Sequence, residues 1–517
     1  MRTLALVLVS GLLAARAAAE DKPARKLNIT VSKETTYVTG PLDKEGYVDY
    51  AAALNERLGK GVTPETNANV LIWKALGPRA QGGKPTPAKV FKLMGIEEPP
   101  EKGDYFIELR PFLRDRLGIE DREQLDAIDG QSYTLTHQPW TATDHPQVAD
   151  WLKANEKPLN LILEALKRPH YFAPVYRAGD KPTADLVAAL LANTQAARTL
   201  TTALAVRGML RVGDGKPADA WPDLLACQRI GRYVARRGSL LDALVGFACE
   251  SIGQHATATL LERPELDGRQ LAGFLRDLRA LPPMPTVADH LDGGERFVVL
   301  DNITISIRGG SATVKALTGG VADLPEDAEI EWDRALGNVN RHFDRMAAAL
   351  RQKDRDKRQA EFDRISADLS ELQKARRTAV DKTGKDPLAE ATPRDRGEAM
   401  GDILITPLVP AVRNIQAAYD HTEQGTRNLQ VGLAIAGYQR EHGTYPKAID
   451  ALAPKYLDKV PDDLFTGKPL VYRPSKDGYL LYSLGPNGKD DEGRFMRDDP
   501  PGDDIAIRVP VPKPQKN

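Results

Sequence analysis

The sequence is short of cysteine, of aromatic residues and of net charge. Its 517 residues include 2 cysteines and 6% aromatic side chains, and the formal net charge is −1. A protein that binds nucleic acids in general needs a basic surface, so this balance argues against such a function. Ala, Leu, Arg and Glu are abundant instead, and this composition favours helices.

Motifs of known catalytic centres are also missing. There is no G-x-S-x-G or H-E-x-x-H pattern, and the glycine-rich stretch from Gly77 to Gly83 has the wrong spacing for a phosphate-binding loop. The 8 histidines are scattered, and none has metal-site spacing. Hydrolases can use dispersed carboxylates, so one alternative stays open: a periplasmic hydrolase between the N-terminal and helical regions, using residues such as His170 or Glu164.

The N-terminus has the pattern of a secretory signal. Arg2 precedes an apolar run from Leu4 to Ala15, and the small residues Ala17 to Ala19 follow. We therefore expect cleavage after Ala19 and a soluble, extracytoplasmic protein, either periplasmic or secreted. The apolar run has about twelve residues, whereas a membrane span needs roughly twenty. An uncleaved N-terminal anchor is the alternative, and only in that form would the protein contact a membrane.

A chain of this length should form two to four domains, each with its own core. We expect a signal peptide (1–19), a mixed, mostly helical N-terminal region (20–180), a helical-hairpin domain (181–290), a long helical arm with a linker (291–427) and a small head (428–517). The predicted fold class is mainly α, with stacked helical hairpins and a long charged arm. The head is predicted to be α+β, with a short antiparallel sheet.

Helical periodicity is clearest in the middle of the chain. Apolar spacing predicts helices at about 184–212, 218–237, 240–261 and 269–280. The charged stretch 329–378 carries a heptad-like apolar seam that loses its phase in the middle. Two helices, or one kinked arm packed on the body, are therefore expected rather than a dimeric coiled coil.

Two segments rich in β-branched residues bear on the strand content. Alternating apolar and polar residues over 27–38 predict a strand. The segment 297–307 (FVVLDNITISI) is compatible with either a strand or a helix.

The two cysteines lie on either side of a predicted turn between helices. Gly238 is a good helix stop and Ser239 a good N-cap, and Cys227 and Cys249 are equally far from that turn along the chain. An antiparallel helix pair would bring them to the same level. In an oxidising compartment a disulfide between them is one expectation, and two buried free thiols are the alternative.

The most specific run of motifs lies at the C-terminal end. A helix predicted from Asn428 to Glu441 leads into HGTYP, and LAPKYL, VPD and YSLGPNG follow in that order. The segments 470–473 and 479–484 are predicted strands joined by an Asp-Gly turn, and 505–509 adds a third. This order of motifs resembles the globular head of the major pseudopilin of type II secretion. In that family the head follows a long N-terminal membrane helix with a prepilin peptidase site, which this chain lacks before residue 428.

The resemblance also implies a calcium site, because the loop after the Ser-Leu-Gly strand end binds calcium in the major pseudopilin. Asp503 and Asp504 match the family's terminal acidic pair, and Asn487 stands where the family usually has Asp. The remaining candidate ligands are the carbonyl of Leu484 and the loop residues Asp490 and Asp491. Calcium takes six to eight oxygen ligands of these types. A solvated acidic loop without an ion is the alternative.

The sequence as a whole favours an exported structural or interaction protein with a pseudopilin-like head. We expect a protein partner, although the sequence does not identify it. Besides the hydrolase, a second alternative is an accessory role in a type II secretion or pilus-like assembly.

Overall fold

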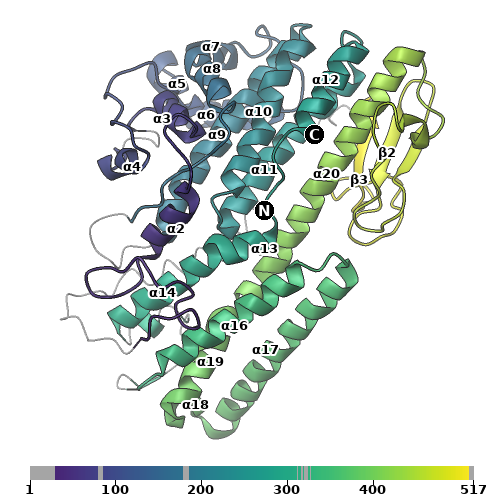
Figure 1. Cartoon of the computed structure of the whole chain (residues 1–517). Coiled ribbons are helices and arrows are strands. Elements are labelled where there is room, and N and C mark those ends of the chain that lie inside the picture. The colour runs from purple at the N-terminus through teal and green to yellow at the C-terminus, as the bar shows by residue number, and fades with distance from the viewer. Residues whose placement is uncertain are drawn as a thin grey trace.

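The computed structural model is mainly α-helical, with one small antiparallel sheet near the C-terminus, so the predicted fold class is confirmed (Figure 1). The structure describes residues 29–79, 85–177, 186–310, 313–315, 318, 324–325 and 328–511. The predicted signal peptide, 1–19, lies outside them. Of the helices in these ranges, none combines the length and the apolar character that crossing a bilayer requires.

The N-terminal region consists of short helices joined by turns. They are α2 (Tyr50–Gly59), α3 (Ala68–Leu76), α4 (Ala88–Leu93), α5 (Leu109–Leu117), α6 (Arg122–Thr134), α7 (Pro146–Ala154) and α8 (Glu156–Ala165). The strand predicted over 27–38 is wrong, because the described part of that segment forms turns. The hydroxyls of Thr35 and Thr36 bond to the carbonyls of Thr30 and Ser32, and such local bonds compete with strand pairing.

The centre of the molecule is a stack of long helices: α9 (Leu186–Gly213), α10 (Pro217–Ala235), α11 (Leu240–Ala258) and α12 (Gly268–Arg279). These bounds confirm the four helices that the sequence predicts. The helices α10 and α11 approach closely where Gly231 faces Gly246, since a Cβ on Gly231 would lie 2.5 Å from the carbonyl oxygen of Gly246. A capping box formed by Ser239 and Asp242 begins α11.

A continuous helical path leads from this stack towards the arm. It runs through α13 (Val287–His290), the π-helical turn η3 (Leu291–Glu295) and α14 (Arg296–Gly309). The ambiguous segment 297–307 is therefore helical. Phe297, Leu300 and Ile303 are buried at helical spacing, and the polar residues Asp301 and Thr304 of this helix are buried as well.

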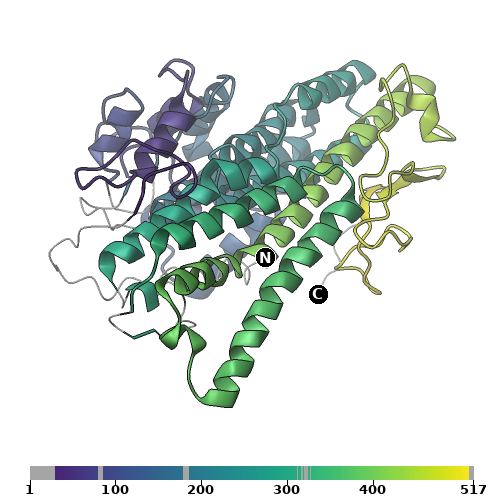
Figure 2. The ribbon, with the colours of Figure 1, turned by 60° about the horizontal axis from the view of Figure 1, so that its bottom comes forward.

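The charged stretch forms two helices rather than one. They are α16 (Trp332–Leu350) and α17 (Arg355–Thr383), followed by α18 (Pro387–Glu390) and α19 (Pro393–Ile405). Asp354 caps the start of α17, which explains why the apolar seam loses phase there. Figure 2 shows α17 as a long helix across the front of the molecule. Only a short stripe of Phe362, Ile365 and Leu369 is buried, so most of α17 is exposed.

The C-terminal part is built on one long helix, α20 (Leu408–His442), which is followed by the short helix η4 (Ile449–Leu452). The strands β1 (Val471–Pro474), β2 (Tyr479–Ser483) and β3 (Ile505–Val509) pair antiparallel in the order β1-β2-β3. The predicted strands agree within a residue. The helix begins earlier than the predicted Asn428, so the predicted boundary between 427 and 428 lies inside it.

Two large apolar cores hold these parts together. One joins α3, α5 and α7 to α9–α12 and to the second half of α20 with the sheet. The other joins α2, α14, α16 and α17 to the first half of α20. Because Val412 and Ile415 lie in one core and Leu429 and Leu433 in the other, α20 connects both. Figure 1 shows α20 between α11 and the sheet.

Candidate metal site in the C-terminal head

A tight turn at Gly485, just after β2, begins the loop that the sequence predicts to bind calcium. Gly485 has φ +64, and a Cβ there would lie 2.1 Å from the carbonyl oxygen of Asp503, so only glycine fits. The buried carboxylate of Asp463 accepts hydrogen bonds from the Ser483 hydroxyl (2.9 Å) and the Leu484 N–H (3.0 Å). These contacts fix the backbone beside Asp503.

Three of the predicted ligands converge on one point. Oxygen atoms of Asp491, Asp503 and Asp504 lie within 4.8 Å of one another. Backbone N–H groups hold one side of each carboxylate. Asp504 Oδ2 accepts from Gly493 (2.7 Å) and Asp491 (3.1 Å), Asp491 Oδ2 accepts from Asp503 (3.1 Å), and Asp503 Oδ2 accepts from Asn487 (3.0 Å). The loop backbone therefore presents the carboxylates to a common centre.

The other side of two carboxylates has no partner within the described residues. Asp503 Oδ1 and Asp504 Oδ1 are buried without a hydrogen bond, and Asp504 is 1% exposed. A buried, unpaired carboxylate oxygen is costly unless something supplies positive charge or a hydrogen bond. Either a proton or a cation at these two oxygens would meet that requirement.

The closeness of the three carboxylates and their burial change the pKa values of these groups. Burial, together with the charges of Asp491 and Asp490, raises the pKa of Asp504 to about 6. Burial and the Asp491 charge also raise the pKa of Asp503. The N–H of Asp503 lowers the pKa of Asp491. A cation at the centre would relieve this repulsion, because it favours the charged form of all three groups.

The remaining predicted ligands lie at or outside the edge of this cluster. The amide of Asn487 donates to Asp491 Oδ2 (3.3 Å), while its oxygen accepts from Lys489 N–H (2.6 Å). Asp490 turns away and accepts from the Tyr482 hydroxyl (2.9 Å) and Arg473 (3.0 Å). Its role as a direct ligand is thus not supported by this geometry. Leu484 is placed at the corner, with its N–H on Asp463.

The donors in the cluster suit a hard cation. The cluster offers the oxygens of three carboxylates. Calcium prefers oxygen ligands, whereas softer metals prefer nitrogen and sulfur ligands. Asp491, Asp503 and Asp504 would hold the ion, whereas the oxygen of Asn487 accepts from the Lys489 N–H and does not face the cluster. Water would have to complete the six to eight ligands that calcium takes.

The two cysteines are buried free thiols in this structure, which is the alternative to the predicted disulfide. Cys227 Sγ lies 3.4 Å from the carbonyl oxygen of Thr201, to which it donates. Burial raises the pKa of Cys249 to about 11 and that of Cys227 well above its usual value. Neither thiol is therefore poised for chemistry.

A cavity lies where the hydrolase alternative would need one. It measures about 960 Å³ and is lined by α2, α4, α14 and residues 172–177. Its carboxylates Asp43 and Asp301 form ion pairs with Arg308 and Arg177. His170 and Glu164 are exposed and do not line it. Two further acids line the cavity: Asp49 caps α2, and the exposed Glu56 forms no ion pair in the described part of the chain. The cavity therefore supports the hydrolase alternative only through residues other than His170 and Glu164.

A serine, an acid and a histidine lie near the start of α11, but all three are buried. Ser239, Asp242 and His290 are between 0% and 3% exposed. The Ser239 hydroxyl donates to Asp242 Oδ2 (2.6 Å) as part of the helix cap. This arrangement begins a helix, and it offers a substrate no access.

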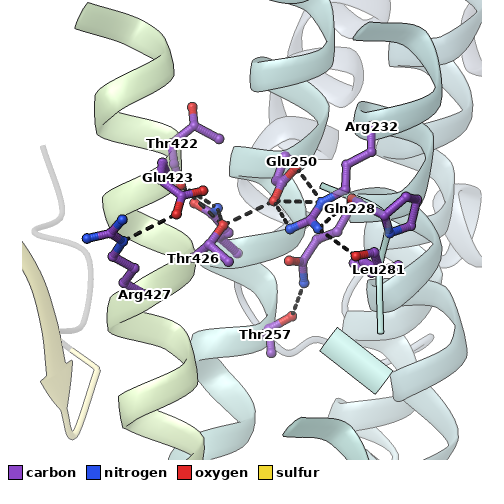
Figure 3. A network of polar contacts seen from close by, with 11 residues as sticks. Gln228, Arg232, Glu250, Thr257, Leu281, Thr422, Glu423, Thr426 and Arg427 are labelled. Carbon is purple, nitrogen blue, oxygen red and sulfur yellow. Dashed lines mark hydrogen bonds and ion pairs between the residues drawn. The ribbon is translucent and has the colours of Figure 1, made fainter. Parts of the chain in front are cut away.

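A buried polar network that the sequence did not reveal joins α20 to the body (Figure 3). Arg232 on α10 donates to Glu250 on α11 (2.8 Å), and Thr426 on α20 donates to the same Glu250 oxygen (3.1 Å). Gln254 on α11 adds bonds to Thr426 (2.9 Å) and to the Thr422 carbonyl (3.0 Å). These residues stand far apart in the sequence, so no local pattern could have grouped them.

A second chain of contacts runs from α20 into the head. Gln424 donates to Asn428 (2.7 Å), and Asn428 donates to the carbonyl of Ile505 at the start of β3 (2.7 Å). The helix α20 is thus hydrogen-bonded both to the body and to the head.

No protein-family model, curated protein or solved structure matches this chain. The assignment of the site therefore depends on its geometry.

Proposed function

We propose that the protein is an exported structural or interaction protein whose pseudopilin-like head is fixed rigidly to a helical body and binds calcium. The observation that carries this proposal is the continuity of α20. Its first half lies in the core that contains α2, α14, α16 and α17, and its second half in the core that the sheet of the head shares with α3, α5, α7 and α9–α12. A single helix shared in this way makes the two parts move together.

The surroundings of α20 also weigh against a pilus-like subunit. In the pseudopilin family the corresponding helix begins in the membrane and has its own peptidase site. Here the first half of α20 packs on α11, α13, α17 and α19 of the same chain. That surface is already covered, so an accessory role in a secretion assembly is the weaker proposal.

Calcium would act on the loop between β2 and β3. The ion would neutralise Asp491 in the first half of this loop and Asp503 and Asp504 at its end. Binding would thereby hold the loop against the sheet and fix the surface of the head. The unpaired Oδ1 atoms of Asp503 and Asp504 are the main support for this role.

A calcium titration followed by thermal unfolding tests the site. A ligand that binds only the folded state stabilises it by about 2.7 kcal/mol at a hundredfold excess over Kd. We expect the wild type to melt at a higher temperature with millimolar calcium and Asp504→Asn to show no shift. Asp450→Asn, an exposed carboxylate of the same head, should keep the full shift. Equal shifts in all three proteins, or no shift in the wild type, would end the calcium proposal.

Fractionation and cross-linking of intact source cells test export and interaction. The expected product is a mature chain that begins at Glu20, found outside the cytoplasm and cross-linked to a defined protein. A cytoplasmic chain that keeps residues 1–19 contradicts export. A chain that cross-links to nothing contradicts the interaction role, whatever calcium does.

A further inference from the structure

A groove of about 1060 Å³ lies between α12 and the part of α20 that enters the head. Its floor is small and apolar, with Leu275 from α12 and Leu433, Ala434 and Gly437 from α20. The far wall is the segment after η4, where the hydroxyl of Tyr456 donates to Glu441 (2.5 Å). The groove therefore combines elements of the body and of the head.

The near wall is the exposed face of α12. Arg269, Ala272, Arg276 and Arg279 follow at helical spacing on this face, and all four are exposed. Ala272 is short, so it leaves space on this face between Arg269 and Arg276. Such a face can take a chain segment lying along the groove.

Positive charge is concentrated here in a nearly neutral chain. The charged lining residues are the cations Arg269, Arg276, Arg279, Arg440 and Lys455 and the acids Asp267 and Glu441. The formal net charge of the whole chain is −1, so the local excess is not a general property of its surface. It creates a potential that favours an anionic partner.

Part of this charge is already used. Arg279 pairs with Asp458, and Lys455 pairs with Glu441. Arg440 donates to the backbone carbonyls of Arg263 and Leu266, which precede α12. In the ranges that the structure describes, Arg269 and Arg276 form neither an ion pair nor a hydrogen bond. These two guanidinium groups are therefore free to bind a ligand.

We propose that this groove binds an acidic segment of a partner protein. Two carboxylates of the segment pair with Arg269 and Arg276, and its small apolar side chains rest on the floor. This identifies the chemistry of the partner and rests on the interaction role proposed above. An inorganic anion or an acidic polysaccharide would use the arginines but leave the exposed apolar lining residues Ala272 and Ala280 without an apolar partner, so a peptide accounts for both features.

The spacing of the arginines sets the spacing of the carboxylates. Arg269 and Arg276 are seven residues apart on one helix, which is about 10 Å along its axis. A segment in the polyproline II conformation brings its side chains back to the same face every three residues, about 9 Å further along. The carboxylates should therefore be three residues apart in a polyproline II segment or seven apart in a helical one.

Peptide binding to the full mature chain tests this. The probes are fluorescein-labelled peptides of Ala, Leu and Ser with a pair of Glu residues at varied separations, each matched by a Gln peptide, and anisotropy gives Kd. We expect separations of three or seven to bind best and the Gln match to bind about tenfold more weakly, since exposed Arg–carboxylate pairs are modest. The double variant Arg269→Glu/Arg276→Glu should lose the difference.

The matched control is Lys374→Glu/Arg377→Glu, which makes the same charge change on the exposed face of α17. It should bind the peptides like the wild type. Equal loss in both double variants, no preference for Glu over Gln, or tighter binding of heparin or phosphatidylglycerol vesicles than of every peptide overturns the proposal. If a partner in cells still cross-links to the Arg269→Glu/Arg276→Glu variant, the interaction role stands and the proposal that the groove binds this partner is wrong.

Discussion

Two buried carboxylate clusters lie on either side of α20, and they differ in how completely the chain satisfies them. On the body side, Glu250 is 1% exposed and receives Arg232 and Thr426. On the head side, Asp504 is also 1% exposed, yet its Oδ1 has no partner within the described residues. One cluster is complete within the chain, and the other is not.

The difference separates a structural role from a ligand role. A buried acid with a guanidinium and a hydroxyl needs nothing more, and its removal leaves a buried cation behind. The charged form of a buried acid beside two other acids is destabilised unless a proton or a cation neutralises the repulsion. Substitutions should therefore have opposite signs in the two clusters, which is a sharper test than the size of either effect.

The largest effect is expected at the complete cluster. Glu250→Ala leaves Arg232 buried without its partner, and we expect a loss of about 3–5 kcal/mol in the free energy of unfolding. Urea unfolding measures it. Glu423→Ala is the control, because Glu423 forms a half-exposed pair with Arg427 on the same helix and should cost under about 1 kcal/mol. Equal costs would remove the distinction between buried and exposed pairs.

At the incomplete cluster a substitution should stabilise. In Asp504→Asn the amide oxygen can keep the N–H groups of Asp491 and Gly493, and its NH₂ group can donate to the remaining acids. With the pKa of Asp504 raised from 3.8 to about 6, neutralising it at pH 7 should stabilise the calcium-free protein by up to about 3 kcal/mol. A calcium-free melt below that of the wild type would show that the carboxylate is a structural acceptor instead.

The same contrast explains which parts of the structure could be predicted from the sequence. The helices α9–α12 and the three strands have clear periodicity and clear stop signals such as Gly238 and the Asp477-Gly478 turn. Each of these depends on neighbours along the chain. The first half of α20 was missed because Thr422 and Gln424 interrupt its apolar pattern. In the structure both are buried, the Thr422 hydroxyl donates to the Ala418 carbonyl, and the Gln424 amide donates to Asn428.

The candidate site was predictable only as a set of residue types. The resemblance to the pseudopilin head indicated Asp503 and Asp504, and the structure groups them with Asp491. It could not indicate that Asp490 would turn to Tyr482 and Arg473. That choice depends on side chains of β1 and β2, which become neighbours only when the sheet forms. The Arg232–Glu250 pair was missed for the same reason.

The free energy of unfolding of the wild type and of Asp504→Asn should depend differently on pH, and this effect is smaller than the two above. The folded carboxyl keeps its proton up to about pH 6, whereas the unfolded one loses it near 3.8, so the folded state binds more protons in this window. Wild-type stability should therefore fall relative to the variant as pH rises from 4 to 6, with a slope of up to about 1.4 kcal/mol per unit. Calorimetry in chelator buffers measures it.

Calcium should reverse that trend, since its ligands must lose their protons to bind. Affinity measured by titration calorimetry should rise from pH 5 to pH 7 in the wild type. A stability difference between wild type and Asp504→Asn that does not change with pH, or an affinity that does not, would mean that Asp504 is not the strained acid of the cluster.

The smallest effect tests whether α20 is held by the complete cluster. Thr426→Val keeps the shape of the side chain and removes the hydroxyl that bonds to Glu250 (3.1 Å), so we expect a loss of about 1 kcal/mol. Thr199→Val is the control, because its hydroxyl bonds only to Gln195 of its own helix. In a Glu250→Ala background, Thr426→Val should cost less, since the bond to Glu250 is already gone and only the one from Gln254 (2.9 Å) is lost. If both costs add in full, Thr426 and Glu250 act independently, and the network does not couple α20 to the body.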